Sequence, residues 1–199
     1  MFHKRVGVRL KSAVAVFSTS LLLAGCSTYA ADRYAVSMDS QEELQTVSTA
    51  APSRKVQVST FSANEPGRTE IGCRGVGPIK TPDGESFEEY IRKALIDQLR
   101  LAQIYSPDGA IHISGRLDKI DFSSYEGIWY LVVTVTNENN NSFVASENYD
   151  YQSSFVGETA CNQTAQALMP AVQNLIRKIV SSPEFKAMLA NHSETAGIS

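Results

Sequence analysis

The chain has 199 residues, of which 43% are hydrophobic, and it carries 18 Lys and Arg against 21 Asp and Glu for a formal net charge of −3 at pH 7. Binding to nucleic-acid phosphates needs a basic surface, so this acidic balance argues against a nucleic-acid partner. The apolar content is ample for one hydrophobic core, and we expect a single folded domain.

Residues 1–25 have the pattern of a secretory signal peptide. Their basic side chains, Lys4, Arg5, Arg9 and Lys11, precede an apolar run that begins at Ala13. This run is shorter than the roughly 20 apolar residues that cross a bilayer, so we do not interpret it as a membrane span. Residues 1–25 hold four basic and no acidic residues, so their removal leaves 14 basic against 21 acidic residues and a net charge near −7.

The signal sequence ends in Leu23-Ala24-Gly25-Cys26. This tetrapeptide resembles the lipobox of bacterial lipoproteins, in which the cysteine is acylated and becomes the mature N-terminus. The resemblance implies that Cys26 carries the lipid, and two or three acyl chains anchor a protein stably to a membrane. In enterobacterial lipoproteins an Asp after the cysteine favours the inner membrane, so Ser27 implies the outer membrane, with the protein facing the periplasm.

Two further cysteines, Cys73 and Cys161, remain in the mature chain. An even pair in an exported protein usually forms a disulfide, and we expect one here; the alternative is two buried free thiols. A metal site has less support, because no histidine or further thiol lies near either cysteine to complete a tetrahedral ligand set. We therefore expect no metal and no cofactor.

Residues 26–54 are mostly small and polar, with little apolar periodicity. Such a segment buries too little apolar surface to offset its ordering entropy, and the sequence predicts a lipidated flexible tether. The sequence also allows a short amphipathic helix over Ser40–Val47 within this tether. The single domain is expected over residues 55–190, followed by a disordered tail at residues 191–199.

The domain begins with a predicted strand over Lys55–Phe61 and a Gly-rich connection over Ile71–Lys80. Ser86-Phe87-Glu88-Glu89 fits a capping box and predicts the start of a helix that continues to about Ala102. Its apolar residues fall on one face at three- and four-residue spacing, and its charged residues, Glu88 among them, are expected in solvent.

Three strands are predicted next. Ile111–Leu117 alternates, and the change of apolar phase near Asp118-Lys119 indicates a β-bulge. Ile128–Thr136 is apolar on both faces, which is typical of a central strand. In residues 143–155, Phe143, Tyr149 and Phe155 are expected on the core face. The alternating residues from Val144 to Gln152 are expected on the solvent-exposed face, which we call the wet face.

A second helix is predicted over residues 160–180, with Pro170 expected to kink or split it. The order β-α-β-β-β-α predicts an α+β sandwich with a mostly antiparallel sheet and two helices on one face. This plan resembles small periplasmic domains such as the N-terminal domain of the Tol propeller protein and the penicillin-binding-protein activator lipoproteins. The run Ala94–Ile104 followed by strand Ile111–Leu117 carries that resemblance, together with the lipobox and the tether.

Few residues suggest catalysis. His112 lies opposite two core residues of its strand and is expected to be exposed, while Asp118, Asp121 and Glu126 are best interpreted as a solvated loop rim. No nucleophile elbow or zinc-protease motif is present in the sequence.

The sequence thus favours a lipid-anchored, non-catalytic accessory or assembly protein of the bacterial envelope, whose partner is an envelope protein or peptidoglycan. The wet face from Val144 to Gln152, or an exposed sheet edge, is the expected docking surface.

The alternative function is a periplasmic small-molecule carrier or an enzyme that uses a cleft between the sheet and the helices. It predicts a deep pocket whose walls are aromatic, with a few convergent polar groups. The candidate wall residues are Trp129, Tyr130, Tyr149 and Tyr151.

Overall fold

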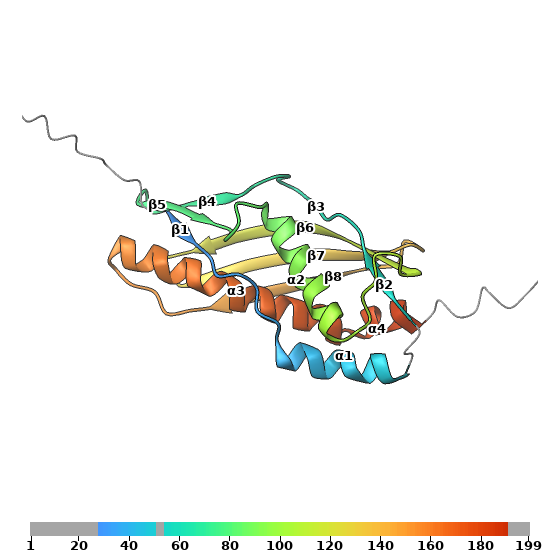
Figure 1. The fold of residues 1–199 in the computed structure, drawn as a ribbon. Coiled ribbons are helices and arrows are strands. Elements are labelled where there is room, and N and C mark those ends of the chain that lie inside the picture. The colour runs from blue at the N-terminus through green and yellow to red at the C-terminus, as the bar shows by residue number, and fades with distance from the viewer. Residues whose placement is uncertain (1–27, 51–53, 191–199) are drawn as a thin grey trace, which may run out of the picture.

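The computed structural model describes residues 28–50 and 54–190, which fold into helices layered against strands (Figure 1). The predicted signal peptide, Cys26 and the predicted tail lie outside the described residues. The described part confirms the α+β class, because its helices and strands are segregated into separate layers.

The main sheet has strand order β2-β6-β7-β8, with β3 also paired to β6. Its long strands β6, β7 and β8 form an antiparallel meander, as predicted, whereas β2 and β3 run parallel to β6. The bounds are β2 Val56–Val58, β3 Ser62–Ala63, β6 Ile111–Ser123, β7 Ile128–Asn137 and β8 Ser142–Asp150.

The predicted bulge is confirmed by a register shift between Leu117 and Lys119 in the β6–β7 pairing. Earlier in β6, Gly115 faces the ring of Phe61, and a Cβ atom at Gly115 would come within 2.5 Å of that ring. Gly115 therefore makes room for an aromatic side chain from the segment between β2 and β3, which closes that edge of the core.

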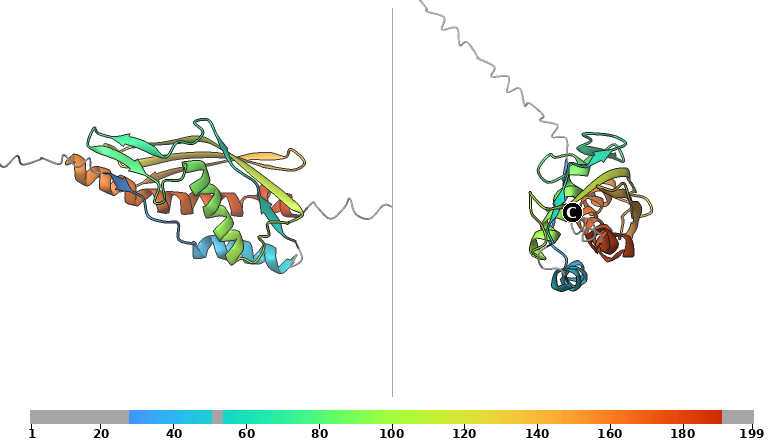
Figure 2. Two further views of the ribbon diagram at one scale, coloured as in Figure 1. Left: turned by 45° about the horizontal axis from the view of Figure 1, so that its top comes forward. Right: turned by 90° about the vertical axis from the view of Figure 1, so that its right-hand side faces the viewer.

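Two helices, α2 (Phe87–Leu101) and α3 (Gly157–Ser181), lie on the same side of the main sheet, and α4 (Pro183–Ala190) follows α3 (Figures 1 and 2). They cover the face of β7 that is fully buried. This buried row consists of Trp129, Leu131, Val133 and Val135. The opposite face of β7 is half-buried and carries Ile128, Tyr130 and Val132.

The helix α2 begins as predicted, since the Ser86 hydroxyl accepts a hydrogen bond from the Glu89 amide. The Glu89 carboxylate does not reach back to the cap; it pairs with Arg92, whose hydrogen bond lowers the pKa of Glu89. The helix α3 runs unbroken through Pro170, so the predicted split does not occur. The carbonyl that loses its partner belongs to Gln166, and because Gln166 is exposed, water can bind it.

The predicted tether is wrong for residues 28–50. Strand β1 (Tyr29–Ala30) pairs in parallel with β5, and helix α1 (Met38–Ala50) packs against α3 and α2. The short helix that the sequence allows over Ser40–Val47 is therefore borne out by the structure. Leu44 of α1 is fully buried. The side-chain amide of Gln98, buried in α2, accepts from the Ser37 amide and donates to the Ser37 carbonyl, both at 2.9 Å.

Two tyrosines add to this docking of the N-terminal segment. The Tyr34 hydroxyl donates to Gln98, and the Tyr90 hydroxyl donates to the Asp32 carbonyl at 2.8 Å. Burial raises the pKa of both tyrosines, so both stay neutral well beyond the ordinary tyrosine range. The folded domain therefore begins by residue 28 and not at residue 55.

The Gly-rich connection is a β-hairpin. Strands β4 (Glu70–Cys73) and β5 (Gly77–Lys80) pair antiparallel, and with β1 they form a small sheet of order β1-β5-β4. Arg74 and Gly75, in the turn between them, have φ of 47° and 69°. The segment predicted to be an irregular Gly-rich connection is therefore regular, and its glycines did not indicate a loop.

We expect Leu44→Ala to lower the free energy of unfolding by about 2–5 kcal/mol, because it opens a cavity in a closed site. Guanidinium-induced unfolding followed by circular dichroism measures this loss. The control is Met38→Ala on the same helix, where the side chain is 74% exposed and a change within about 0.5 kcal/mol is expected. Equal stability of the two variants would restore the flexible-tether interpretation.

Candidate functional site

The aromatic residues predicted to line one pocket point in different directions. Trp129 and Tyr130 are neighbours in β7 and lie on opposite faces of the sheet. Trp129 is fully buried: its indole N–H donates to the Thr164 carbonyl at 2.8 Å, and its ring lies 4.8 Å from that of Phe122. The structure does not bring the two rings to one wall.

The other two aromatic residues of that set lie near the start of α3 or beside β7. The Tyr151 hydroxyl hydrogen-bonds the Thr164 hydroxyl at 2.8 Å, and burial raises its pKa while this hydrogen bond opposes the rise. Tyr149 of β8 is half-buried and pairs in register with Trp129. Both tyrosines therefore serve the packing between β8, β7 and α3.

The predicted acidic rim is only partly assembled. Asp118 lies at the bulge, where its carboxylate binds Arg116 at 2.6 Å and the Thr134 hydroxyl at 2.5 Å. Asp121 lies nearby and shares the cleft described next. Glu126 lies in the β6–β7 turn and does not line it, and His112 is exposed, as expected from the strand alternation.

A cleft of about 380 Å³ separates the start of α2 from the bulge of β6; we call it the Glu88 cleft. Glu88 is only 8% exposed. One of its oxygens accepts a hydrogen bond from the Gly67 amide at 2.8 Å, and the other has no partner among the described residues. The cleft is lined by Ala63, Asn64, Glu65, Arg68, Phe87, Glu88, Leu117, Asp118, Lys119, Ile120 and Asp121.

The sequence placed Glu88 in solvent, and that prediction is wrong. The loop before β4 folds over the first turn of α2, where the Phe87 amide donates to the Arg68 carbonyl at 3.0 Å. Helical periodicity gives only the position of Glu88 around its own helix. It carries no information about a loop that covers the position from outside.

A second hollow, of about 390 Å³, lies along the outer edge of β8; we call it the β8 groove. In strand β8 the exposed residues alternate with the inward ones, which confirms the predicted wet face. Glu147 points inward and is ion-paired to Lys178 of α3 at 2.7 Å, and Lys178 also donates to the Ser146 carbonyl at 2.8 Å. The groove is lined by Phe143, Val144, Ala145, Ser146, Lys178, Ser182 and Glu184.

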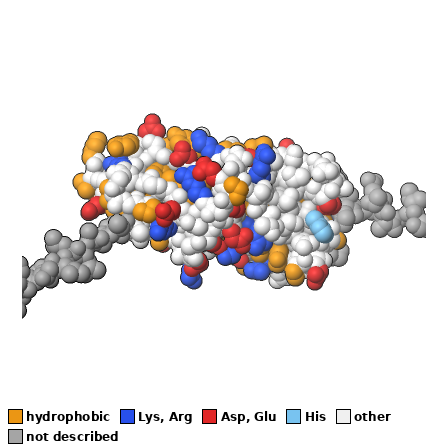
Figure 3. All heavy atoms as spheres, turned by 90° about the horizontal axis from the view of Figure 1, so that it is seen from above, with side chains coloured by type: hydrophobic (Ala, Val, Ile, Leu, Met, Phe, Trp, Pro, Cys, Tyr) orange, Lys and Arg blue, Asp and Glu red, His pale blue; other side chains and the backbone are white. Residues whose placement is uncertain are grey.

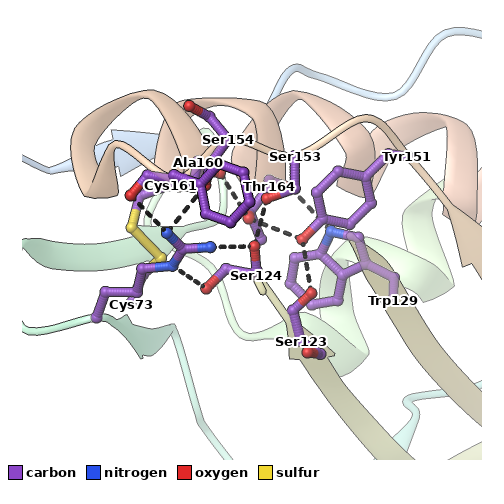
Figure 4. The surroundings of a disulfide bond; sticks show 12 residues. Cys73, Ser123, Ser124, Trp129, Tyr151, Ser153, Ser154, Ala160, Cys161 and Thr164 are labelled. Atoms are coloured by element: carbon purple, nitrogen blue, oxygen red, sulfur yellow. Dashed lines mark hydrogen bonds between the residues drawn. A yellow bond between two sulfur atoms is a disulfide. The ribbon is translucent and has the colours of Figure 1, made fainter. Parts of the chain in front are cut away.

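A disulfide joins Cys73, at the end of β4, to Cys161 in the second turn of α3, as predicted, with 5.9 Å between their Cα atoms (Figure 4). Beside it, Arg74 donates to the Ser124 hydroxyl at 2.9 Å and to the carbonyls of Ser124, Ser154 and Phe155. The disulfide and Arg74 together attach the small sheet to the β6–β7 turn and to the segment before α3.

Phe155, which the strand pattern placed in the core, is fully exposed. The strand β8 ends at Asp150, and the following residues turn toward α3, so alternation no longer applies at position 155. Val156 and Tyr125, at 61% and 79% exposure, are also large apolar side chains in solvent.

Among the described residues, no three His, Cys, Asp or Glu side chains form a group that could hold a metal ion. Within the same ranges, 28–50 and 54–190, no helix has the length and apolar character needed to span a bilayer. The face seen in Figure 3 intersperses Lys and Arg with Asp and Glu.

No family model and no curated protein matches this chain. Among solved structures, a Xanthomonas campestris protein assigned to the family model DUF330 aligns with a TM-score of 0.47 and 8% sequence identity, covering 77% of this chain and 95% of that chain. A likeness at this level carries no argument about function. The class of the protein, an α+β domain closed by a disulfide, follows from its own structure.

We expect reduction of the disulfide to lower the free energy of unfolding by about 2–5 kcal/mol, since it closes a long loop, with a sequence separation of 88, in the unfolded chain. The measurement is urea unfolding with and without reductant. The double variant Cys73→Ala, Cys161→Ala is the control and should not respond to reductant. Unchanged stability of the native chain on reduction would contradict a structural role for the bond.

Proposed function

We propose that this chain is a lipid-anchored accessory or assembly protein of the bacterial envelope that binds another envelope component without catalysis. The main support for this proposal is the combination of the lipobox-like sequence ending at Cys26 with the disulfide between Cys73 and Cys161. Disulfides persist in oxidising compartments such as the periplasm, and a lipobox directs a protein to the same place. Ser27 supports an outer-membrane anchor with the domain facing the periplasm.

The β8 groove is the surface that best suits binding of another protein. β8 is an edge strand of the main sheet, and its exposed edge can pair with an added strand. Val144, at 63% exposure, supplies an apolar contact at the centre of the groove wall. The bond from Lys178 to the Ser146 carbonyl occupies one acceptor of this edge and limits uncontrolled pairing of the kind that leads to aggregation.

A photo-crosslinking amino acid at position 144 of the full-length protein in cells should capture one abundant envelope protein. The same group at position 38, also strongly exposed but on α1, should not capture it. With the crosslinking group moved to position 146, which is exposed in the same groove, Val144→Asp should reduce capture about tenfold, the effect of roughly 1.4 kcal/mol in binding free energy. Mass spectrometry identifies the captured chain.

Equal capture from positions 144 and 38 would contradict docking in the β8 groove. If position 144 captures no protein and the chain cosediments with purified cell wall, the partner is peptidoglycan and not a protein. Failure of both experiments would remove the support for an accessory role.

A second candidate function, a periplasmic small-molecule carrier, is favoured by the Glu88 cleft. Its wall holds a carboxylate with a spare acceptor oxygen, which suits a ligand that carries an ammonium or other N–H donor. This cleft lies between the sheet and helix α2, but none of the aromatic residues predicted to line the pocket of that alternative contributes to its wall.

If the cleft binds such ligands, 1,4-diaminobutane should raise the midpoint of thermal unfolding of the native protein in proportion to its occupancy. Glu88→Gln should remove this shift, because the amide lacks the negative charge. Glu65→Gln, on the same cleft but in an exposed ion pair with Arg68, is the matched control and should keep it. An unchanged midpoint in the native protein would exclude diamines as ligands of the cleft.

A further inference from the structure

Three large apolar side chains, Tyr125, Phe155 and Val156, are exposed together; we call them the apolar tip. They come from two segments: the β6–β7 turn and the connection between β8 and α3. Their backbone is held in place by Arg74, whose guanidinium group binds the Phe155 carbonyl and lies 4.0 Å over the Tyr125 ring. The apolar tip is therefore a set of exposed apolar side chains whose positions are fixed by Arg74.

The turn that carries Tyr125 depends on Gly127. Its φ is 74°, and a Cβ atom there would come within 2.2 Å of the Tyr151 carbonyl oxygen. The Gly127 carbonyl accepts from the Tyr151 amide at 2.7 Å, so the β6–β7 turn is bonded to the segment that leads to Phe155. Both parts of the tip are therefore tied to each other as well as to Arg74.

The apolar tip lies at the end of the molecule where the N-terminal chain enters the fold. β1 runs parallel to β5, with Tyr29 opposite Ile79, so the start of β1 lies toward the β4–β5 turn that contains Arg74. In that turn Val76 lies against Gly157 at the start of α3, next to Val156. Figure 1 shows β1 and β5 at the left-hand end of the fold, and Figure 3 shows a group of hydrophobic side chains at that left-hand end.

This geometry sets a short distance to the lipid anchor. Two residues, Ser27 and Thr28, lie between Cys26 and Tyr29. A fully extended chain spans at most about 3.6 Å per residue, so the three steps from Cys26 to Tyr29 place the start of β1 within about 11 Å of an acylated Cys26. A 28-residue tether would have allowed any face of the domain to meet the membrane. A chain of this length allows only the end that carries the apolar tip.

We propose that the apolar tip inserts into the lipid bilayer to which Cys26 is anchored, so that the protein is held to the membrane by its lipid and by Tyr125, Phe155 and Val156. This inference rests on the proposed lipid anchor. Large exposed apolar groups that gather on a surface mark an interaction site, and Tyr is enriched at membrane interfaces. Interfacial apolar groups are buried about 5–10 Å into the boundary between headgroups and acyl chains, and the two segments reach it only if this end faces the membrane.

The contact is apolar and not electrostatic. Glu126 and Glu158 are exposed beside the apolar tip, and Arg74 is engaged with backbone carbonyls. The acidic side chains would be repelled by anionic lipid but are tolerated among headgroups in water. A zwitterionic lipid, phosphatidylcholine, is therefore the appropriate probe.

The test uses the full-length protein, processed and acylated in cells, purified in detergent and reconstituted in phosphatidylcholine vesicles with or without brominated acyl chains. Phe155→Trp places an indole on the tip, and Val144→Trp places one on β8 near its opposite end, where the native side chain is 63% exposed. The native Trp129 is fully buried and gives the same background in both. Bromine atoms quench only an indole that enters the acyl region.

For insertion to interfacial depth, the added emission of the Phe155→Trp variant should fall by about half in brominated vesicles, and that of Val144→Trp by less than about a tenth. If the protein is acylated at Cys26 by intact mass and floats with the vesicles, but Phe155→Trp is not quenched, the membrane contact of the tip is refuted while the anchor stands. Equal quenching of both variants also refutes it. If Cys26 carries no acyl group, the anchor fails and the inference fails with it.

Discussion

The covalent bond between Cys73 and Cys161 is the constraint on which the arrangement of this molecule depends. β1 has two residues, and β4 and β5 have four each, a set too short to be stable as an isolated sheet. The disulfide fixes this small sheet to α3, and Arg74 adds hydrogen bonds to the neighbouring turn. With that end fixed, the strand that receives the N-terminal chain has a defined place beside α3.

The fixed end explains how the proposed anchor and the proposed binding surface work together. α3 has 25 residues, which corresponds to about 37 Å at 1.5 Å per residue. The apolar tip lies at its start, and the β8 groove is lined by residues near its end, Lys178 and Ser182. Under the proposed orientation, contact of the tip with the membrane leaves the groove directed away from it, toward the periplasm.

The N-terminal segment shows how tertiary contacts can order a chain whose composition is that of a linker. Residues 26–54 are polar, and they lack the periodic apolar face that stabilises most helices. Residues 28–50 of this segment nevertheless dock, because one fully buried side chain, Leu44, and the buried amide of Gln98 supply contacts that no local pattern encodes. Docking leaves only a few residues of chain between the proposed lipidation site, Cys26, and the folded domain.

The sequence by itself determined the elements whose signal is local or periodic: the capped helix from Phe87, the bulge at Asp118 and the alternating solvent-exposed face of β8. It also predicted the disulfide, because the chain has a signal for export and an even number of cysteines after Cys26. Only the tertiary structure decided that α1 packs, that Glu88 is buried and that Phe155 is exposed. Each of these depends on a segment distant in the chain, or on the point where a strand ends. Periodicity reports the faces of one element, and it cannot report what another element covers.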